Sequence, residues 1–162
     1  MQLDRAEFIG AMRNVANTVS VVTTNGDAGR HGATVSAFCS VSADPPTALV
    51  CLHGMSRIAD LVQKNGNFNI NILAEGTRHY ADRFAGMHDG SISDRFEGID
   101  TDPDAIPELP GATVLICEID QCIPSGSHVI VIGKVRAVSN GDKHPLTYLD
   151  GAYHQVTPLQ IQ

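Results

Sequence analysis

The sequence has few aromatic residues and no tryptophan. Phenylalanine, tyrosine and tryptophan make up 5% of its 162 residues, so the core must rest on valine, isoleucine, leucine and alanine. β-Branched residues pack well on the pleated surface of a sheet, and this composition favours a strand-rich protein. A chain of this length buries enough surface to fold without disulfides or metal. We expect one domain over residues 1–162.

Positive charge is also scarce. The chain has 11 lysines and arginines against 18 aspartates and glutamates, which gives a net charge of −7. This balance argues against nucleic-acid binding but is compatible with a local basic pocket for one phosphorylated ligand. No apolar run approaches membrane-spanning length, so no membrane contact is expected. The first residues lack the basic and apolar regions of a signal peptide, and we expect a cytoplasmic protein.

The spacing of cysteine and histidine gives no sign of a metal site or a disulfide. The four cysteines include no Cys-x-x-Cys pair, and Cys39, Cys51 and Cys117 lie in apolar runs that are typical of structural thiols. The seven histidines show no His-x-x-x-His spacing. We therefore expect no bound metal, and no local signature supports a Cys-His hydrolase.

Apolar periodicity predicts helices and strands along the chain. A helix is expected from Asp4 to about Asn17, because Asp4 and Glu7 form a capping box ahead of apolar residues at helical spacing. Further helices are expected at 56–64 and 77–84. Strands are expected at 19–24, 33–42, 48–53, 67–73, 112–123 and 128–138, and 146–154 forms a last strand or a docked segment. Residues 86–111 have no sustained period and are expected to form a long loop, which in compact domains is often functional.

The order of these elements favours an α+β or barrel architecture. Helices between strands are also typical of a doubly wound parallel sheet, but the early strands are joined by short loops and no Gly-x-Gly-x-x-Gly opens a helix. In the strand at 67–73, apolar and amide side chains alternate. This alternation predicts a half-buried strand with an amide-lined outer face.

The most informative stretch runs from Gly32 to Leu52 and predicts two strands joined by a rigid Asp-Pro-Pro turn. The first strand carries hydroxyl side chains at even positions only, so they share one face. These residues are Thr34, Ser36, Ser40 and Ser42. The apolar strand that follows indicates a covered location, where hydroxyls need partners. A polar, planar ligand is one such partner, and an ordinary solvated strand is the alternative.

Several short motifs recur in order over nearly the whole chain. They are Val21-Val22-Thr23-Thr24, Thr-x-Ser-x-Phe-x-Ser-Val-Ser at 34–42, Pro45-Pro46, Gly66 to Leu73, Phe84-Ala85-Gly86, Asp94-Arg95-Phe96, Gly126-Ser127-His128 and Pro145 to His154. This ordered set resembles the signature of the flavin reductase-like family, small reductases that supply reduced flavin to two-component monooxygenases. The resemblance implies a mainly β fold with flanking helices, the FMN-binding split β-barrel. It also implies a homodimer with flavin bound near the subunit interface.

The resemblance also implies a set of flavin and dinucleotide contacts. The residues expected to bind cofactor are Ala33, Thr34, Val35, Ser36, Cys51, Leu52, Ser56, Arg57, Phe84, Ala85, Arg95 and Tyr153. Ser56 and Arg57 open a helix, and a helix N-terminus beside a cation suits a phosphate. Each residue also has a structural alternative, namely sheet packing, core packing, a helix cap or a solvated arginine.

His128 is the expected catalytic residue. Many members of the family carry Gly-Asp-His where this chain has Gly126-Ser127-His128. The resemblance implies that His128 contacts the nicotinamide, and we favour this role over proton transfer because hydride transfer to flavin does not require an acid from the protein. The alternative is a histidine at the start of a strand that bonds only to backbone.

The expected function is an NAD(P)H:flavin oxidoreductase that reduces FMN, or FAD, and supplies reduced flavin to a partner monooxygenase. The sequence leaves open the choice between FMN and FAD and between NADH and NADPH. One alternative is a reductase that retains its flavin and passes electrons to a corrin cobalt centre. Another is a split-barrel module that binds flavin or haem without turnover, an idea for which the serine at position 127 leaves room.

Overall fold

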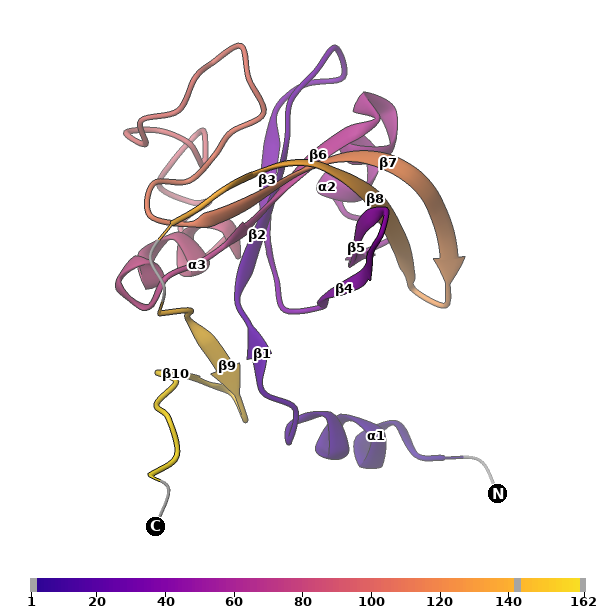
Figure 1. The fold of residues 1–162 in the computed structure, drawn as a ribbon, viewed down its shortest axis with the longest axis vertical. Helices are drawn as coiled ribbons and strands as arrows, with labels where there is room; N and C mark the ends of the chain where they lie inside the picture. Colours follow the sequence, from indigo (N-terminus) through magenta and orange to yellow (C-terminus); the bar gives the residue numbers. More distant parts are fainter. Residues whose placement is uncertain (1–2, 142–143, 161–162) are drawn as a thin grey trace.

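The computed structural model describes residues 3–141 and 144–160, and within these the chain forms ten strands, three α-helices and one 3-10 helix (Figure 1). The helices are α1 (Arg5–Met12), α2 (Arg57–Asn65) and α3 (Arg78–Phe84), with the 3-10 turn η1 (Glu75–Thr77). The strands are β1 (Asn17–Thr18), β2 (Ser20–Thr24), β3 (His31–Val35), β4 (Phe38–Ala43), β5 (Pro46–His53), β6 (Asn67–Ile72), β7 (Thr113–Ser125), β8 (His128–Ser139), β9 (Thr147–Leu149) and β10 (Ala152–His154). None of the described helices is long and apolar enough to cross a membrane.

Seven strands form one antiparallel sheet in the order β3-β2-β6-β7-β8-β5-β4. β3 and β4 are consecutive in the chain but lie at opposite edges of this sheet, so the link between them spans the opening of a split barrel. The Cys51 amide donates to the Ala37 carbonyl within this link, at 2.9 Å. The mainly β class and the split barrel are therefore confirmed, and β7 and β8 curve together as the long predicted hairpin (Figure 1).

One predicted strand is in fact two. The expected strand at 33–42 breaks at Ser36 and Ala37, which lie in neither β3 nor β4. In an unbroken strand, Val35 and Phe38 would face opposite sides, yet both pack against the same apolar cluster. The break reverses the alternation, so the four hydroxyls do not form one ladder. The prediction that these hydroxyl side chains share one face is therefore wrong.

Two apolar clusters hold the sheet between α2 and α3. Val22 of β2 packs with Ile58 and Val62 of α2 inside the barrel, whereas its neighbour Val21 packs on the other face of β2, with Phe84 of α3. Ile58, Leu61 and Val62 are buried, as the helical spacing predicts, and Ala59 is the one further buried residue of α2. Gly66 ends α2 with a left-handed conformation, φ 73°.

Asn69 and Asn71 on the amide face of β6 are buried, which corrects the prediction of a half-buried strand with an amide-lined outer face. Asn71 donates to the Val21 carbonyl at 3.0 Å and accepts from the Leu109 amide at 2.7 Å. Asn69 donates to the Ile106 carbonyl at 3.0 Å. These bonds fix the end of the predicted long loop, which holds no helix or strand between α3 and β7, against the sheet. Sequence alternation cannot distinguish water from a covering loop as the partner of an amide.

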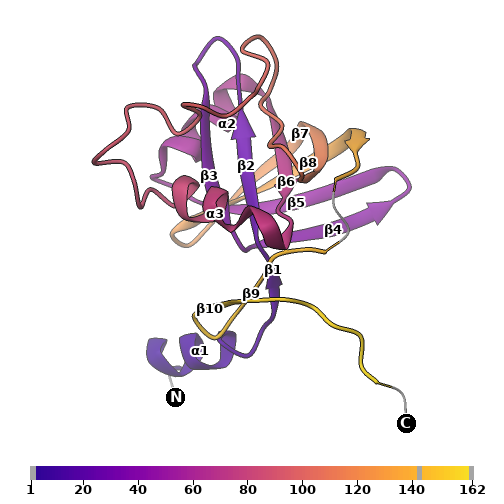
Figure 2. The same ribbon diagram turned by 90° about the vertical axis from the view of Figure 1, so that its left-hand side faces the viewer.

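The N-terminal helix is shorter than predicted and lies away from the body of the molecule (Figures 1 and 2). The capping box of Asp4 and Glu7 is confirmed, but α1 ends at Met12, and the chain then enters β1 at Asn17. β1, β9 and β10 form a separate three-stranded sheet, so the expected last strand at 146–154 is a pair of short strands. No residue of α1 is buried.

Candidate functional site

A first cleft lies beside β3 on the side covered by α2, and we call it the β3–β5 cleft. Its volume is about 300 Å³. It is lined by Ala33, Thr34, Val35, Ser36, Ala37, Cys51, Leu52, His53, Ser56, Ile58 and His128. Eight of the thirteen predicted site residues are in this lining, drawn from segments far apart in the sequence. The sheet brings them together because β5 pairs with β8, which places His53 opposite His128.

A second cleft of about 400 Å³ continues along β3 toward its N-terminal end, and we call it the arginine cleft. It is lined by Arg30, His31, Arg57, Asp89, Ile92, Ser93, Asp94 and Arg95. Arg57 and Arg95 were predicted from the sequence. The two clefts meet where Ser56 of the first adjoins Arg57 of the second, and where Ala33 follows His31 along β3.

A third, smaller cleft of about 220 Å³ lies by the end of β3 and of α3 and shares Thr34, Val35 and Ser36 with the β3–β5 cleft. It is lined by Val19, Thr34, Val35, Ser36, Ala85, Tyr148 and Tyr153. It holds two further predicted residues, Ala85 and Tyr153. The Tyr153 hydroxyl donates to Asp82 at 3.1 Å, and the Arg78 guanidinium lies 4.8 Å from the centre of the Tyr153 ring. Desolvation, and then the bond to Asp82, raises the pKa of Tyr153.

The edge of β3 that faces the clefts is paired with no other strand in the part of the chain that the structure describes. β3 is an end strand that pairs only with β2. The Gly32 carbonyl points away from β2, since it accepts from Arg95 Nη1 at 2.9 Å. Alternate residues of an antiparallel strand direct their peptide groups to the same side, so those of Thr34 face this open edge too. Such an edge offers a donor and an acceptor in line, which fits the polar rim of a flavin ring.

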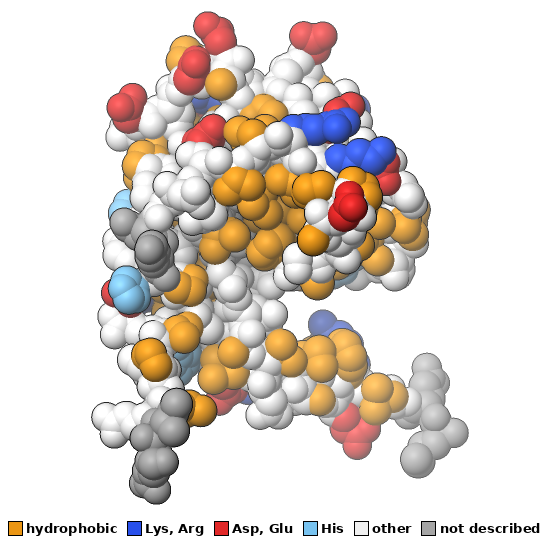
Figure 3. Space-filling model, viewed as in Figure 1, with side chains coloured by type: hydrophobic (Ala, Val, Ile, Leu, Met, Phe, Trp, Pro, Cys, Tyr) orange, Lys and Arg blue, Asp and Glu red, His pale blue; other side chains and the backbone are white. Residues whose placement is uncertain are grey.

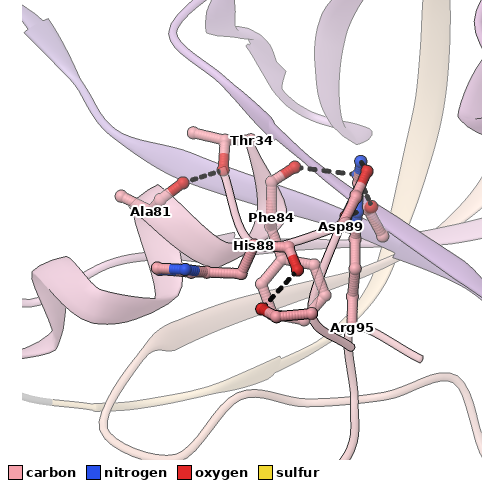
Figure 4. Close-up of polar contacts among 8 residues, drawn as sticks. Thr34, Ala81, Phe84, His88, Asp89 and Arg95 are labelled. Atoms are coloured by element: carbon pink, nitrogen blue, oxygen red, sulfur yellow. Dashed lines mark hydrogen bonds and ion pairs between the residues drawn. The ribbon is translucent and has the colours of Figure 1, made fainter. Parts of the chain in front are cut away.

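Two predicted hydroxyls already have protein partners. Thr34 Oγ1 donates to the Ala81 carbonyl at 2.7 Å, which ties β3 to α3 (Figure 4). Ser56 Oγ accepts from the Ala59 amide at 3.3 Å as the N-cap of α2 and donates to the His53 carbonyl at 2.6 Å. For the Ser56 hydroxyl, the structural alternative of a helix cap is therefore correct.

Arg57 and Arg95 differ in their surroundings. Arg57 is exposed and makes no hydrogen bond or ion pair with the residues that the structure describes. Arg95 is 18% exposed and nearly fully bonded. Its Nη1 donates to the Gly32 and Phe84 carbonyls, at 2.9 and 3.0 Å, and its Nε and Nη2 donate to the two carboxylate oxygens of Asp89, at 2.9 and 2.6 Å (Figure 4).

The arginines dominate the electrostatics of the arginine cleft. Burial first, and then the positive charges of Arg95 and Arg57, lower the pKa of His31 to about 4. His31 is therefore neutral near pH 7, so the positive charge of this cleft comes from its arginines. Arg30 is paired with Asp94 at 2.5 Å and stacks on Phe96 at 4.8 Å.

The Phe84 ring lines none of the three clefts, and the contact of this residue with cofactor stays a prediction. The ring is 1% exposed and packs edge-to-face on Phe96, with centroids 5.0 Å apart. A Cβ added at Gly32 would lie 2.7 Å from the Phe84 ring, so β3 lies directly on this side chain. Phe84 is a positioning residue that supports the strand from beneath and offers its carbonyl to Arg95.

His128 lies exposed at the start of β8. Its Nδ1 is 2.9 Å from Ser127 Oγ, so a serine hydroxyl contacts the ring where the family pattern has a carboxylate. The His128 and His53 rings meet edge-to-face at 5.5 Å. His53 was not among the site residues predicted from the sequence, although its position at the end of the predicted strand at 48–53 could have indicated it.

Other missed residues came from the predicted long loop and from the start of β3. Asp89, Asp94, Arg30 and His31 all line the arginine cleft. The loop was identified as functional, but its contacts depend on where it folds back. The four cysteines are free, as predicted for structural thiols. Burial raises the pKa of Cys117 to about 12, whereas Cys39 is exposed despite its apolar run.

Comparisons with known proteins agree with this geometry. Residues 12–157 match the flavin reductase like domain. FMN reductase (NADH) RutF of Cronobacter sakazakii is 34% identical over 159 residues, covering 95% of this chain and 94% of that protein. The reductase component of 4-hydroxyphenylacetate 3-monooxygenase from Salmonella typhimurium is 35% identical over 162 residues, covering 96% and 95%.

A solved structure shows the same fold over almost all of the chain. The styrene monooxygenase flavin reductase of Pseudomonas putida S12 matches with a TM-score of 0.81 at 27% identity, over 96% of this chain and 99% of that one. The family identified from the motifs is thus confirmed by sequence and by structure. The chain belongs to the flavin reductase-like domain family.

Proposed function

We propose that this protein is an NADH-dependent FMN reductase that supplies reduced flavin to a partner oxygenase. The observation that carries the proposal is the pair of neighbouring clefts along the open edge of β3, one lined mostly by small side chains and the other by arginines. Relatives similar to this chain are named for FMN and NADH and for monooxygenase systems. NADH oxidation that depends on added FMN tests the proposal, and its absence would refute it.

The two clefts suit the two ends of FMN. The ring fits the β3–β5 cleft, where Ala33 and Val35 provide flat apolar contact and the Thr34 peptide groups face the open edge. The phosphate fits the arginine cleft, where Arg57 has an uncommitted guanidinium. A strand rises about 3.3 Å per residue, so the five steps from His31 to Ser36 span about 16 Å, enough for an extended mononucleotide.

The flavin ring supplies the hydride chemistry, and the protein supplies position. His128 and His53 line the β3–β5 cleft, and we place the nicotinamide against His128. Tyr153 and Ala85, in the third cleft, are the proposed contacts for the rest of the dinucleotide. The β3–β5 cleft is open to solvent at exposed residues such as Ser36 and His53, which suits a flavin that leaves after reduction.

His128→Ala is expected to raise the KM for NADH several-fold and to leave FMN affinity little changed, because the imidazole contacts the donor and not the flavin. Steady-state kinetics over a range of NADH concentrations measure the first effect, and flavin titration measures the second. His88→Ala is the matched control, since His88 is exposed and lines none of the three clefts. Kinetics of the His128 variant equal to those of the wild type would remove His128 from the site.

We also infer that the protein is a homodimer in which a second copy covers α1. Phe8, Ile9 and Met12 of α1 are each more than 40% exposed. Figure 3 shows apolar side chains on the side of α1 that faces the hollow below the main sheet. Apolar area of this kind is a common interaction surface. Sedimentation velocity is expected to show a dimer for the wild type and a shift toward monomer for the Phe8→Asp variant. A monomeric wild type would contradict the inference.

A further inference from the structure

The guanidinium of Arg95 has two edges with different partners. One edge, Nη1, is bound to the Gly32 and Phe84 carbonyls and is thereby fixed to β3 and to the end of α3. The other edge, Nε with Nη2, is bound by both oxygens of Asp89 (Figure 4). This second edge is the fork that binds carboxylates and phosphates in the same bidentate geometry.

Asp89 is held only by this fork. Its side chain is 50% exposed, and both oxygens bond to Arg95 and to no other described residue. Asp94, the other carboxylate of the cleft, is anchored differently, because it also accepts from the Phe96 amide at 2.9 Å. Of these two carboxylates, Asp89 is therefore the one that can leave its arginine without breaking a backbone contact.

The local backbone is shaped for the Asp89–Arg95 pair. Gly86 has φ 86°, and a Cβ there would lie 2.8 Å from Arg95 Nη2 and 3.0 Å from Asp89 Oδ2. Only glycine provides both this conformation and this space. The pair thus occupies a fixed place in the wall of the arginine cleft, beside the unpaired Arg57.

We propose that Asp89 is an internal competitor for the phosphate of FMN: its carboxylate occupies the fork of Arg95 that the phosphate takes when the ligand binds. The inference rests on the proposed function, which places the phosphate in this cleft. Arg95 keeps its position during the exchange because Nη1 stays bonded to the two carbonyls. The competition weakens the binding of flavin, as release of the reduced product requires.

The relative strength of the two pairings favours the exchange. Exposed ion pairs contribute little, because water screens the charges and both side chains lose freedom. A phosphate monoester carries up to two negative charges and meets Arg57 as well as Arg95, so it gains more from the cleft than one carboxylate does. Arg95 and Arg57 both lower the pKa of His31, after the larger effect of burial, whereas Asp89 acts in the opposite direction.

The test compares FMN and riboflavin binding in the wild type, Asp89→Asn and Asp120→Asn. Riboflavin has the same ring and no phosphate, so it does not compete with Asp89. Asp120→Asn is the matched control, since it removes the same charge from the ion pair of Asp120 with Lys134. Neither residue of this pair lines the β3–β5 cleft or the arginine cleft. Flavin fluorescence titration is expected to give an FMN Kd about fivefold lower for Asp89→Asn, with the riboflavin Kd unchanged. A fivefold change corresponds to the upper end of the free energy that an exposed ion pair contributes.

The outcomes separate this inference from the function on which it rests. A wild type that binds neither flavin would refute the proposed function and the inference with it. A wild type that prefers FMN to riboflavin, with an Asp89→Asn variant that binds FMN no more tightly, would overturn the inference alone. Equal tightening for both flavins would also overturn it, because the effect would not involve the phosphate. Asp89→Ser serves as the second variant if the asparagine variant has a lowered Tm.

Discussion

Phe84→Ala is expected to lower the free energy of unfolding by about 3–5 kcal/mol, the cost of removing a large buried side chain and leaving a cavity. The ring is 1% exposed, packs on Phe96 and lies directly under Gly32 of β3. Its loss removes contacts from α3, β3 and the long loop together. Urea unfolding followed by circular dichroism measures the change.

Met87→Ala is the control for Phe84→Ala. Met87 lies three residues further along the chain and is 70% exposed, so its truncation is expected to change stability by less than about 0.5 kcal/mol. A loss below about 1 kcal/mol for the Phe84 variant would contradict its role as the support of β3.

Arg57→Gln is expected to raise the Kd for FMN about tenfold or more, because a hydrogen bond to a charged group contributes about 1.5–3 kcal/mol. Arg57 is the cation of the arginine cleft without a protein partner among the described residues, so its whole charge is available to the phosphate. Equilibrium titration with FMN at low ionic strength measures the effect, which salt should reduce.

The specificity of the Arg57 effect is tested with riboflavin and with Arg136→Gln. Riboflavin affinity should be unchanged in Arg57→Gln, since the ring binds in the other cleft. Arg136 is an exposed arginine paired with Glu118 on the hairpin of β7 and β8, and its substitution should change neither Kd. If Arg57→Gln weakened both flavins equally, Arg57 would act on the shape of the site and not on the phosphate.

Local pattern predicted most of the elements but not the point where the barrel opens. Helix α2 follows from the Ser56 cap, the apolar spacing and Gly66, all of which are local signals. The break at Ser36 and Ala37 has no such signal, because it exists to carry the chain from one edge of the sheet to the other. The buried amides of Asn69 and Asn71 likewise depend on loop residues that are 37 and 38 positions distant in sequence.

The same division applies to the site. The resemblance led to the lining of the β3–β5 cleft, because that lining comes from strands whose motifs are continuous in sequence. It did not lead to His31, Asp89 or the two roles of Arg95, which arise where the long loop folds against β3. Phe84 shows a further limit of motif matching, since the ring of this motif residue is buried in the core, where it supports β3.

Anaerobic reduction of a large excess of FMN by NADH tests the central claim most directly. With a catalytic amount of protein, loss of the oxidised flavin absorbance should continue until most of the excess is reduced, because reduced flavin leaves the open cleft and is replaced. Reduction that stops at the amount of flavin the protein binds would contradict release and favour an electron-transfer protein that retains its flavin. No reduction despite bound flavin would contradict the enzyme activity itself.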